Sequence, residues 1–202
     1  MADYILQLQD ITKVFPGVKA LSEVSFNVER GHIHALVGEN GAGKSTLIKV
    51  ICGVYPHGTY DGKVIFDGQE CKFHNIREVE RTGIACIHQE MNLVPDMNVM
   101  ENIFINNQPN KMGYIDFDEM HNRCLKLLKD VGLDVSPEEI IRNLGVGQQQ
   151  MVEIAKALML NATVIIMDEP TSALSNAEVD ELFRITRDLR SQGKSIVYIS
   201  LR

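Results

Sequence analysis

The chain has 202 residues, of which 45% are hydrophobic and 23% are charged, and its net charge is −7. These values are typical of one globular domain that carries at most an inserted subdomain. The acidic balance, without any cluster of Lys and Arg, argues against a protein that binds bulk nucleic acid. No apolar run approaches the roughly 20 residues of a membrane helix, and the start lacks the features of a signal peptide. We therefore expect a cytoplasmic protein that reaches a membrane only through a partner.

The four cysteines, Cys52, Cys71, Cys86 and Cys124, form no C-x-x-C pair and match no zinc-binding spacing. We expect them to be reduced and to serve in packing rather than in disulfides. The six histidines also lack the spacing of metal ligands.

The first part of the chain reads as mostly β-structure with one embedded helix. Alternating apolar residues predict strands over 4–8 and 24–28, and an apolar run predicts a third strand over 32–37 that ends at Gly38. A helix follows from about Lys44 and stops at Gly53. Residues 63–68 and the short run after them are typical of a hairpin.

Beyond this region the sequence predicts helices first and then an α/β alternation. A short helix over 76–82 is closed by Gly83, and a buried strand follows over 84–87. Residues 91–160 read as mostly helical, with Asp116 and Glu119 as a capping box and Ser136-Pro137-Glu138 as the start of another helical turn. The remaining predicted elements are a central strand over 164–167, a helix from about 179 that closes at Gly193, and a strand over 195–200.

A phosphate-binding loop is predicted between the third strand and the first helix. Gly38-Glu39-Asn40-Gly41-Ala42-Gly43-Lys44-Ser45 matches G-x-x-x-x-G-K-[ST]. Glycines allow backbone N–H groups to curl round phosphates, and the helix N-terminus adds a positive dipole end. Lys44 can then reach the β- and γ-phosphates, and the Ser45 hydroxyl can bind Mg²⁺. The alternative is a glycine-rich turn that matches the pattern by chance.

Two adjacent carboxylates follow the predicted central strand. Asp168 and Glu169 stand at its carboxyl end, which is a favourable place beside a phosphate-binding loop. Asp168 would hold Mg²⁺, and Glu169 would orient or deprotonate the attacking water. The alternative is a solvated acidic pair that opens the turn at Pro170.

A second glycine-rich loop, Leu144-Gly145-Val146-Gly147-Gln148-Gln149-Gln150, precedes a helix with Met151, Ile154, Ala155 and Leu158 on one face. A glycine-rich loop at a helix start is a candidate anion site. From the residues alone, an anion site and a flexible loop before an ordinary amphipathic helix are equally favoured.

The order and spacing of these three motifs resemble those of the ATP-binding subunits of bacterial ABC importers, over essentially the whole chain. The stretches 15–21 and 147–158 are similar to those of the monosaccharide importers. Residues 53–60 together with Gly145 resemble the xylose and multiple-sugar branch, whereas most of the wider family has Ser at the position of Gly145.

The resemblance implies roles for single residues. Phe15 matches the aromatic residue that stacks on adenine, although a buried strand-end aromatic is the competing interpretation. Gln89 matches a glutamine that contacts Mg²⁺ and the attacking water, where a plain polar strand end is the alternative, and Ser172-Ala173-Leu174-Ser175 matches the family's D-loop. The implied ATP-binding residues are Phe15, Gly38, Glu39, Asn40, Gly41, Ala42, Gly43, Lys44, Ser45, Thr46, Gly145, Gly147 and Gln148. The implied catalytic residues are Glu169, Lys44 and Gln89, and the implied Mg²⁺ ligands are Ser45, Gln89 and Asp168.

The end of the sequence departs from the family pattern. The family has a histidine that contacts the γ-phosphate directly after Tyr198-Ile199-Ser200, and Leu201 stands there instead. Leucine can neither donate nor accept a hydrogen bond, and relatives continue beyond the position of Arg202. We therefore expect a C-terminally incomplete domain that binds nucleotide weakly and hydrolyses it poorly.

Taken together, the predicted fold is an α/β ABC-type ATPase core with an N-terminal antiparallel β part and an inserted helical subdomain. Its core is expected over 1–89 and 161–202, and the helical subdomain with the second glycine-rich loop over 90–160. The resemblance implies ATP and Mg²⁺ as cofactors and ATP-driven import of a monosaccharide. The implied partners are transmembrane permease subunits at the cytoplasmic membrane face, a second nucleotide-binding domain in head-to-tail pairing and, indirectly, a periplasmic sugar-binding protein. The alternatives are a fragment with little or no ATPase activity and an ABC ATPase without a membrane partner.

Overall fold

The computed structural model describes residues 3–88, 92–171 and 174–200. The chain divides into two units. The first contains Met1–Ile87, Ala162–Glu169 and Arg187–Arg202, and the second contains His88–Asn161 and Pro170–Thr186. Residues 92–160 of the expected helical subdomain thus lie in the second unit, which also takes in residues 170–186.

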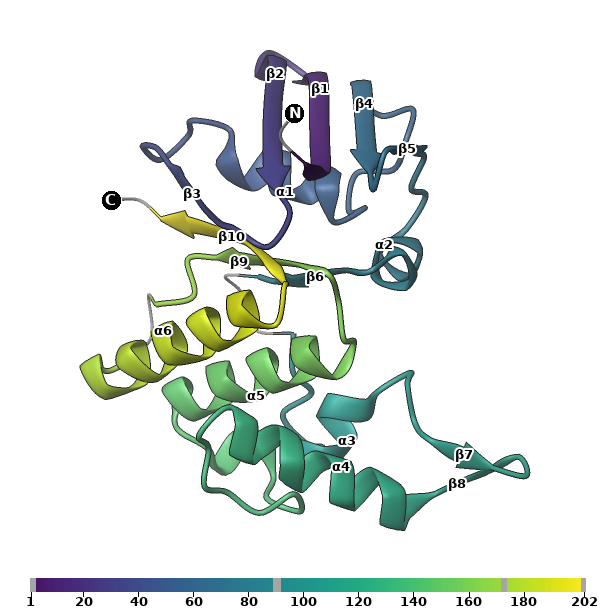
Figure 1. Cartoon of the computed structure of the whole chain (residues 1–202), viewed down its shortest axis with the longest axis vertical. Helices are drawn as coiled ribbons and strands as arrows, with labels where there is room; N and C mark the ends of the chain where they lie inside the picture. The colour runs from purple at the N-terminus through teal and green to yellow at the C-terminus, as the bar shows by residue number, and fades with distance from the viewer. Residues whose placement is uncertain (1–2, 89–91, 172–173, 201–202) are drawn as a thin grey trace. The chain divides into compact units, whose positions relative to one another are not determined.

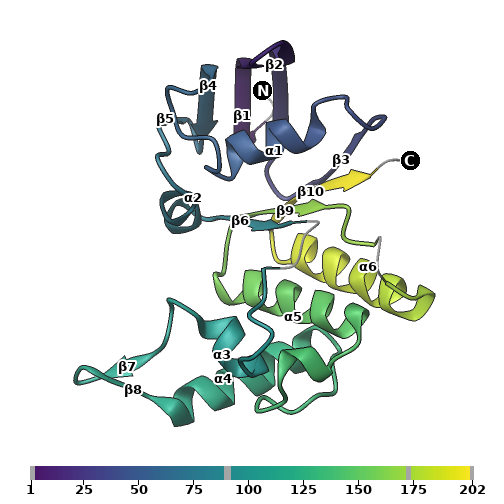
Figure 2. The same cartoon turned by 180° about the vertical axis from the view of Figure 1, so that it is seen from behind.

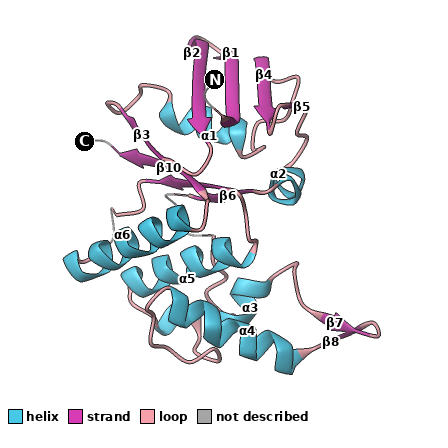
Figure 3. Ribbon diagram, viewed as in Figure 1, coloured by secondary structure: helices cyan, strands magenta, loops and turns pink. Residues whose placement is uncertain are grey.

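An antiparallel sheet forms one part of the first unit. Its strands in the described residues are β1 (Tyr4–Phe15), β2 (Val18–Glu29), β4 (Asp61–Phe66) and β5 (Gln69–Cys71), in the order β2-β1-β4-β5 (Figure 3). Strand β1 is longer than its alternating pattern predicts. Its register against β2 shifts between Leu8 and Ile11, and Asp10 has a φ of 53°. Such a bulge breaks the period-two pattern, so the sequence reveals only the first half of the strand.

A parallel sheet forms the other part of the first unit. Its described strands are β3 (Ile33–Val37), β6 (Ile84–Ile87), β9 (Val164–Asp168) and β10 (Ser195–Ser200), in the order β3-β10-β9-β6. All five residues of β9 are buried, as expected of a central parallel strand. Because all four strands are parallel, their carboxyl ends meet at one edge. The mixed α/β architecture predicted from the sequence is therefore present.

Helix α1 (Lys44–Ile51) lies between these two sheets (Figures 1 and 2). It buries Leu47, Ile48, Val50 and Ile51 in a hydrophobic core that also contains residues of β1, β9 and β10. Helix α2 (Ile76–Thr82) starts where Asn75 accepts a hydrogen bond from the Glu78 amide and ends at Gly83, whose φ is 105°. Both helices occupy the predicted ranges.

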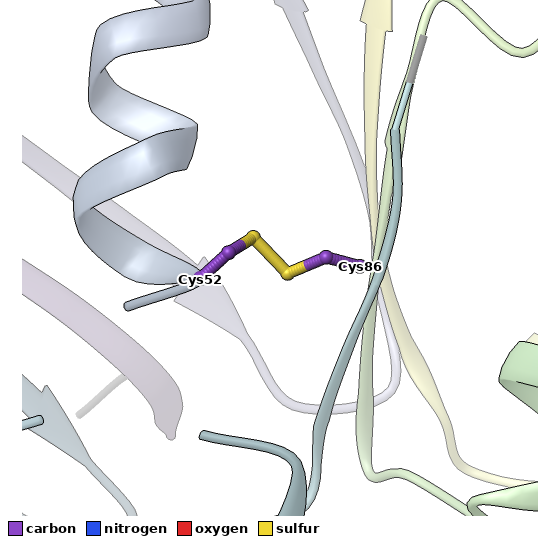
Figure 4. The surroundings of a disulfide bond; sticks show 2 residues. All are labelled: Cys52 and Cys86. Atoms are coloured by element: carbon purple, nitrogen blue, oxygen red, sulfur yellow. A yellow bond between two sulfur atoms is a disulfide. The ribbon is translucent and has the colours of Figure 1, made fainter. Parts of the chain in front are cut away.

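A disulfide joins Cys52, at the end of α1, to Cys86 in β6 (Figure 4). The expectation of four reduced cysteines is wrong for this pair. The two residues are 34 positions apart, and their Cα atoms lie 6.3 Å apart, within the range that a disulfide spans. That distance results from packing of α1 against the parallel sheet, which no spacing in the sequence reveals. Cys71 and Cys124 carry free thiols.

The second unit is mainly helical (Figure 3). It contains α3 (Val99–Phe104), the 3-10 turn η1 (Ile141–Asn143), α4 (Phe117–Asp130) and α5 (Val146–Met159). Helix α6 (Asn176–Ser191) belongs to this unit up to Thr186 and to the first unit from Arg187. Asp116 caps α4 by accepting a hydrogen bond from the Glu119 amide, at the position that the sequence predicts. No helix within the described ranges is long and apolar enough to cross a bilayer.

Two features of this unit differ from the sequence-based expectation. A short hairpin of β7 (Asn110–Lys111) and β8 (Tyr114–Ile115) interrupts the helices. Met112 and Gly113 both have positive φ in its turn, a backbone that suits a tight hairpin. Residues 136–139 form a single hydrogen-bonded turn, in which the Glu139 amide donates to the Ser136 carbonyl, so the predicted turn is present but does not continue into a helix.

Candidate functional site

The loop between β3 and α1 has a backbone that only glycine adopts easily. Gly41 and Gly43 have φ values of 83° and 87°, and the Ala42 amide donates to the Glu39 carbonyl at 3.2 Å. A Cβ atom on Gly43 would lie 2.7 Å from the Ala20 carbonyl oxygen. Position 43 therefore excludes any side chain, both by conformation and by space. The close approach also places the first part of β2 against the loop.

Lys44 lies within this loop rather than out in solvent. Its Nζ donates hydrogen bonds to the carbonyl oxygens of Gly38, at 2.5 Å, and Glu39, at 3.0 Å. The ammonium group thus stands inside the curve of the loop, where it can exchange carbonyl partners for phosphate oxygens. The predicted phosphate-binding residues are contiguous from the end of β3 into the first turn of α1. They are Gly38, Glu39, Asn40, Gly41, Ala42, Gly43, Lys44, Ser45 and Thr46.

The N-terminus of α1 is suited to an anion. Among the described residues no side chain caps it, and its first turn contains no acidic residue. Its positive dipole end is therefore not neutralised by a carboxylate of its own first turn. Ser45 and Thr46 stand in that turn and bring hydroxyl groups to the same place.

The acidic pair lies at the same edge of the parallel sheet as the loop. Val37, the last residue of β3, pairs with Ser200, and Asp168, the last residue of β9, pairs with Ile199. Strand β10 alone separates β3 from β9, so the two strand axes are roughly 10 Å apart. The structure thus brings Asp168 and the phosphate-binding loop to one edge of one sheet, although 124 positions separate Asp168 from Lys44 (168 − 44).

Asp168 and Glu169 differ in burial and in backbone conformation. The side chain of Asp168 is only 7% exposed, whereas Glu169 is half-buried. Glu169 has a φ of 47°, a left-handed backbone that is costly for a residue with a Cβ. Its amide donates to the Ile199 carbonyl at 3.2 Å. Strained backbone of this kind concentrates at functional sites, where it re-aims a side chain.

Phe15 ends β1 and pairs with Val18 at the start of β2. Val18 stands two positions before Ala20, or roughly 7 Å along a strand. Ala20 is the residue whose carbonyl faces Gly43. Phe15 therefore lies near the phosphate-binding loop, as its proposed contact with a base requires. Its half-buried ring meets Tyr55 edge to face, with 5.5 Å between centroids and 64° between planes. The spacing of Tyr55 in the sequence does not indicate this contact.

The second glycine-rich loop begins α5 in the other unit. Gly145 caps the helix, and its amide donates to the Gln148 side chain at 3.0 Å. A Cβ atom on Gly147 would lie 2.2 Å from a carboxylate oxygen of Glu178, so a side chain here would displace the flexible end of that glutamate at the start of α6. Gly145, Gly147 and Gln148 are thus grouped at one helix start, as the sequence predicts. Gln89, Ser172 and Ala173 lie outside the described residues.

The donor set near the loop suits Mg²⁺. The Ser45 hydroxyl and the Asp168 carboxylate are hard oxygen ligands, which Mg²⁺ prefers. Within the described ranges no group of three or more His, Cys, Asp and Glu side chains could hold a metal ion by itself. A magnesium ion bound with phosphates needs only one or two protein ligands, because phosphate and water oxygens supply the others.

Comparisons with known proteins bear on the family of the chain. The family model described as ABC transporter matches residues 21–172. The chain is 56% identical over 200 residues to the xylose import ATP-binding protein XylG of Moorella thermoacetica, covering 99% of this chain and 40% of that protein. It is 51% identical over 200 residues to the L-arabinose transport ATP-binding protein AraG of Geobacillus stearothermophilus, with 99% and 39% covered. The chain thus spans about 40% of the length of the curated relatives it matches.

Solved structures give the same result for the fold. A nucleotide-free ATP-binding cassette from an ABC transporter superposes with a TM-score of 0.85 at 30% identity, covering 98% of this chain and 82% of that one. The dimeric bacterial ABC transporter cassette MJ0796 superposes with a TM-score of 0.85 at 27% identity, with 98% and 88% covered.

Proposed function

From the premise that this chain belongs to the ABC transporter family, we propose that it binds Mg-ATP and transfers the γ-phosphoryl group to water. The observation that carries the proposal is the shared sheet edge: the loop around Lys44 and the pair Asp168–Glu169 end parallel strands that only β10 separates. Ligands of open α/β sheets bind at the carboxyl ends of the strands.

Each residue has a distinct role in this proposal. Lys44 and the amides of residues 38–46 hold the phosphates and offset the charge that develops during transfer. Ser45, Asp168 and Gln89 would hold Mg²⁺, which would supply positive charge to the phosphate oxygens. Glu169 orients the attacking water and accepts its proton.

Phe15 provides a surface for the adenine base. A ring at the end of β1, close to the phosphate-binding loop, can stack on a flat base while the phosphates occupy the loop. The half-buried state of Phe15 supports this role over that of a purely internal packing residue.

The domain belongs, in our proposal, to an importer of a monosaccharide such as xylose. Support comes from the printed functions of the xylose and arabinose transport relatives. Its partners are transmembrane permease subunits, on which the helical subdomain of residues 90–160 docks, at the cytoplasmic face of the membrane. A periplasmic sugar-binding protein delivers the sugar to that permease.

A second nucleotide-binding domain completes the site. Gly145, Gly147 and Gln148 of each domain face the phosphate-binding loop of the other in a head-to-tail pair. The dimeric state of the cassette MJ0796, at a TM-score of 0.85, and the exposed helix start at α5 support this pairing.

The test separates hydrolysis from binding. We expect Glu169→Gln to lower Mg-dependent ATP hydrolysis by about 100-fold or more, because general base catalysis contributes that much, while the Kd for ATP changes by less than about threefold. Lys44→Ala removes a cation that holds phosphates, so the same measurements should show ATP affinity lowered by about tenfold to 100-fold.

The control is Glu23→Gln, which changes an exposed glutamate in the middle of β2. It should leave the hydrolysis rate and the Kd for ATP unchanged. Equal hydrolysis by Glu169→Gln and the wild-type chain would contradict the catalytic role. ATP binding without measurable hydrolysis by the wild-type chain would favour the alternative of a nucleotide-binding fragment.

A further inference from the structure

Three segments of the first unit meet beside Phe15. Lys13 and Phe15 come from β1, Tyr55 follows α1, and Thr59 belongs to the turn after Tyr55. The Lys13 side chain is buried, with only 7% of the residue exposed. Its Nζ donates a hydrogen bond to the Thr59 carbonyl and lies 5.2 Å from the centroid of the Phe15 ring and 4.9 Å from that of Tyr55. A cation within about 6 Å of two aromatic rings attracts both.

Tyr55 is itself tied to the helix that begins at the phosphate-binding loop. Its amide donates to the Lys49 carbonyl at 3.0 Å, in the last turn of α1. Pro56 follows and restricts the backbone of Tyr55 to extended conformations. The backbone of Tyr55 is therefore restrained relative to α1, and the edge-to-face contact of its ring restrains the ring of Phe15 in turn. Rigid supports of this kind hold a binding group at a set position.

We propose that Tyr55, backed by Lys13, is a positioning residue that holds Phe15 at the distance from the phosphate-binding loop that an aromatic nucleobase needs. The inference rests on the proposed contact of Phe15 with the base. Tyr55 then contributes to the selection of a nucleoside triphosphate over a polyphosphate that has no base. Its effect is exerted through Phe15, on which its ring packs.

The experiment compares ATP with inorganic tripolyphosphate, which offers the phosphates without the base. We expect Tyr55→Leu to lower the affinity for ATP about threefold to tenfold, the range that corresponds to an aromatic pair. The affinity for tripolyphosphate should stay within about twofold. Tyr55→Phe keeps the ring and should restore the affinity for ATP. Lys13→Met keeps the methylene stem and removes the cation. It should lower the affinity for ATP less than Tyr55→Leu does and leave the affinity for tripolyphosphate unchanged.

Further variants distinguish a failure of the proposed base contact from a failure of the positioning role of Tyr55. Phe15→Ala tests the proposed base contact itself: an unchanged affinity for ATP would overturn both that contact and the role of Tyr55. A loss in Phe15→Ala without any loss in Tyr55→Leu would overturn the positioning role alone. An equal loss for ATP and tripolyphosphate in Tyr55→Leu would show a general structural role and would also overturn it. Tyr114→Leu, on the exposed hairpin of the other unit, should change neither affinity.

Discussion

Glu169, the proposed catalytic carboxylate, has a backbone conformation that a residue with a Cβ atom adopts only at a cost. A φ of 47° is easily adopted by glycine and costs other residues about 1–2 kcal/mol. This strained conformation occurs directly after the buried strand β9, at the point where the chain leaves the sheet. Such a conflict between local preference and position is expected where function rather than stability selects the residue.

We predict that Glu169→Gly raises the free energy of unfolding by about 1 kcal/mol over Glu169→Ala, while hydrolysis is lost in both. Both variants lack the carboxylate, so their difference reports the backbone alone. Thermal unfolding measures it, as a shift of roughly 2–4 °C. Glu23 has a φ of 51°, so Glu23→Gly should gain similar stability over Glu23→Ala and keep full hydrolysis. A Glu169→Gly variant less stable than Glu169→Ala would refute the strain.

At the scale of elements, the disulfide connects the far end of α1 to the strand β6. Closing a loop with 34 residues of separation restricts the unfolded chain and stabilises the folded one by about 3–4 kcal/mol. We predict that a thiol reductant lowers the unfolding temperature of the wild-type chain, measured by circular dichroism. It should have no such effect on the double variant Cys52→Ala/Cys86→Ala.

Cys71→Ala serves as the control, because Cys71 is a free thiol. That variant should remain as sensitive to the reductant as the wild-type chain. Unfolding of the wild-type chain at the same temperature with and without reductant would argue against the bond.

Helix α4 carries a buried thiol that makes stability depend on pH. Burial, with a smaller effect of Glu138, raises the pKa of Cys124 from 9.0 to about 12. Above pH 9 the unfolded chain loses this proton while the folded chain keeps it, so stability falls as pH rises from 9 towards 12. The slope reaches about 1.4 kcal/mol per pH unit.

We predict that urea unfolding at pH 8 and pH 10 shows this loss in the wild-type chain and a smaller one in Cys124→Ala. The comparison between the two proteins is needed because burial also raises the pKa of Tyr60 and Cys71, which act in the same direction. Identical pH dependence in both proteins would exclude Cys124 as a source.

At the scale of the whole molecule, the proposed function requires two domains to complete each phosphate site. In the proposed head-to-tail pair, the start of α5 in one domain supplies donors to the phosphates bound by the other. The hydrolysis rate per chain should therefore rise in proportion to chain concentration at low concentration. A phosphate-release assay over a dilution series measures this dependence.

Excess Glu169→Gln chains keep their own glycine-rich loop at α5 and should raise the rate per wild-type chain. A rate per chain that stays constant on dilution would argue that one domain suffices. Leu201 lies outside the described residues. The low absolute rate of hydrolysis expected from its departure from the family pattern therefore stays a prediction.

The sequence by itself determined the elements and motifs whose signals are local. The strand before Gly38, the helix from Lys44 and the buried strand before Asp168 each follow from short-range patterns of hydrophobicity, glycine and capping residues. They lie where the sequence predicts them. The predicted members of the phosphate-binding loop are likewise contiguous in the chain, so no tertiary information was needed to group them.

Only the tertiary structure decided which distant segments meet. The sequence suggested that Asp168 lies beside the phosphate-binding loop, and the strand order β3-β10-β9-β6 decided that β10 alone stands between their strands. Packing of α1 on the parallel sheet joins Cys52 to Cys86, and the loop after α1 brings Tyr55 to Phe15. These contacts depend on how buried faces fit together across long sequence separations. A local pattern carries no record of such a fit, because many partners could bury the same face.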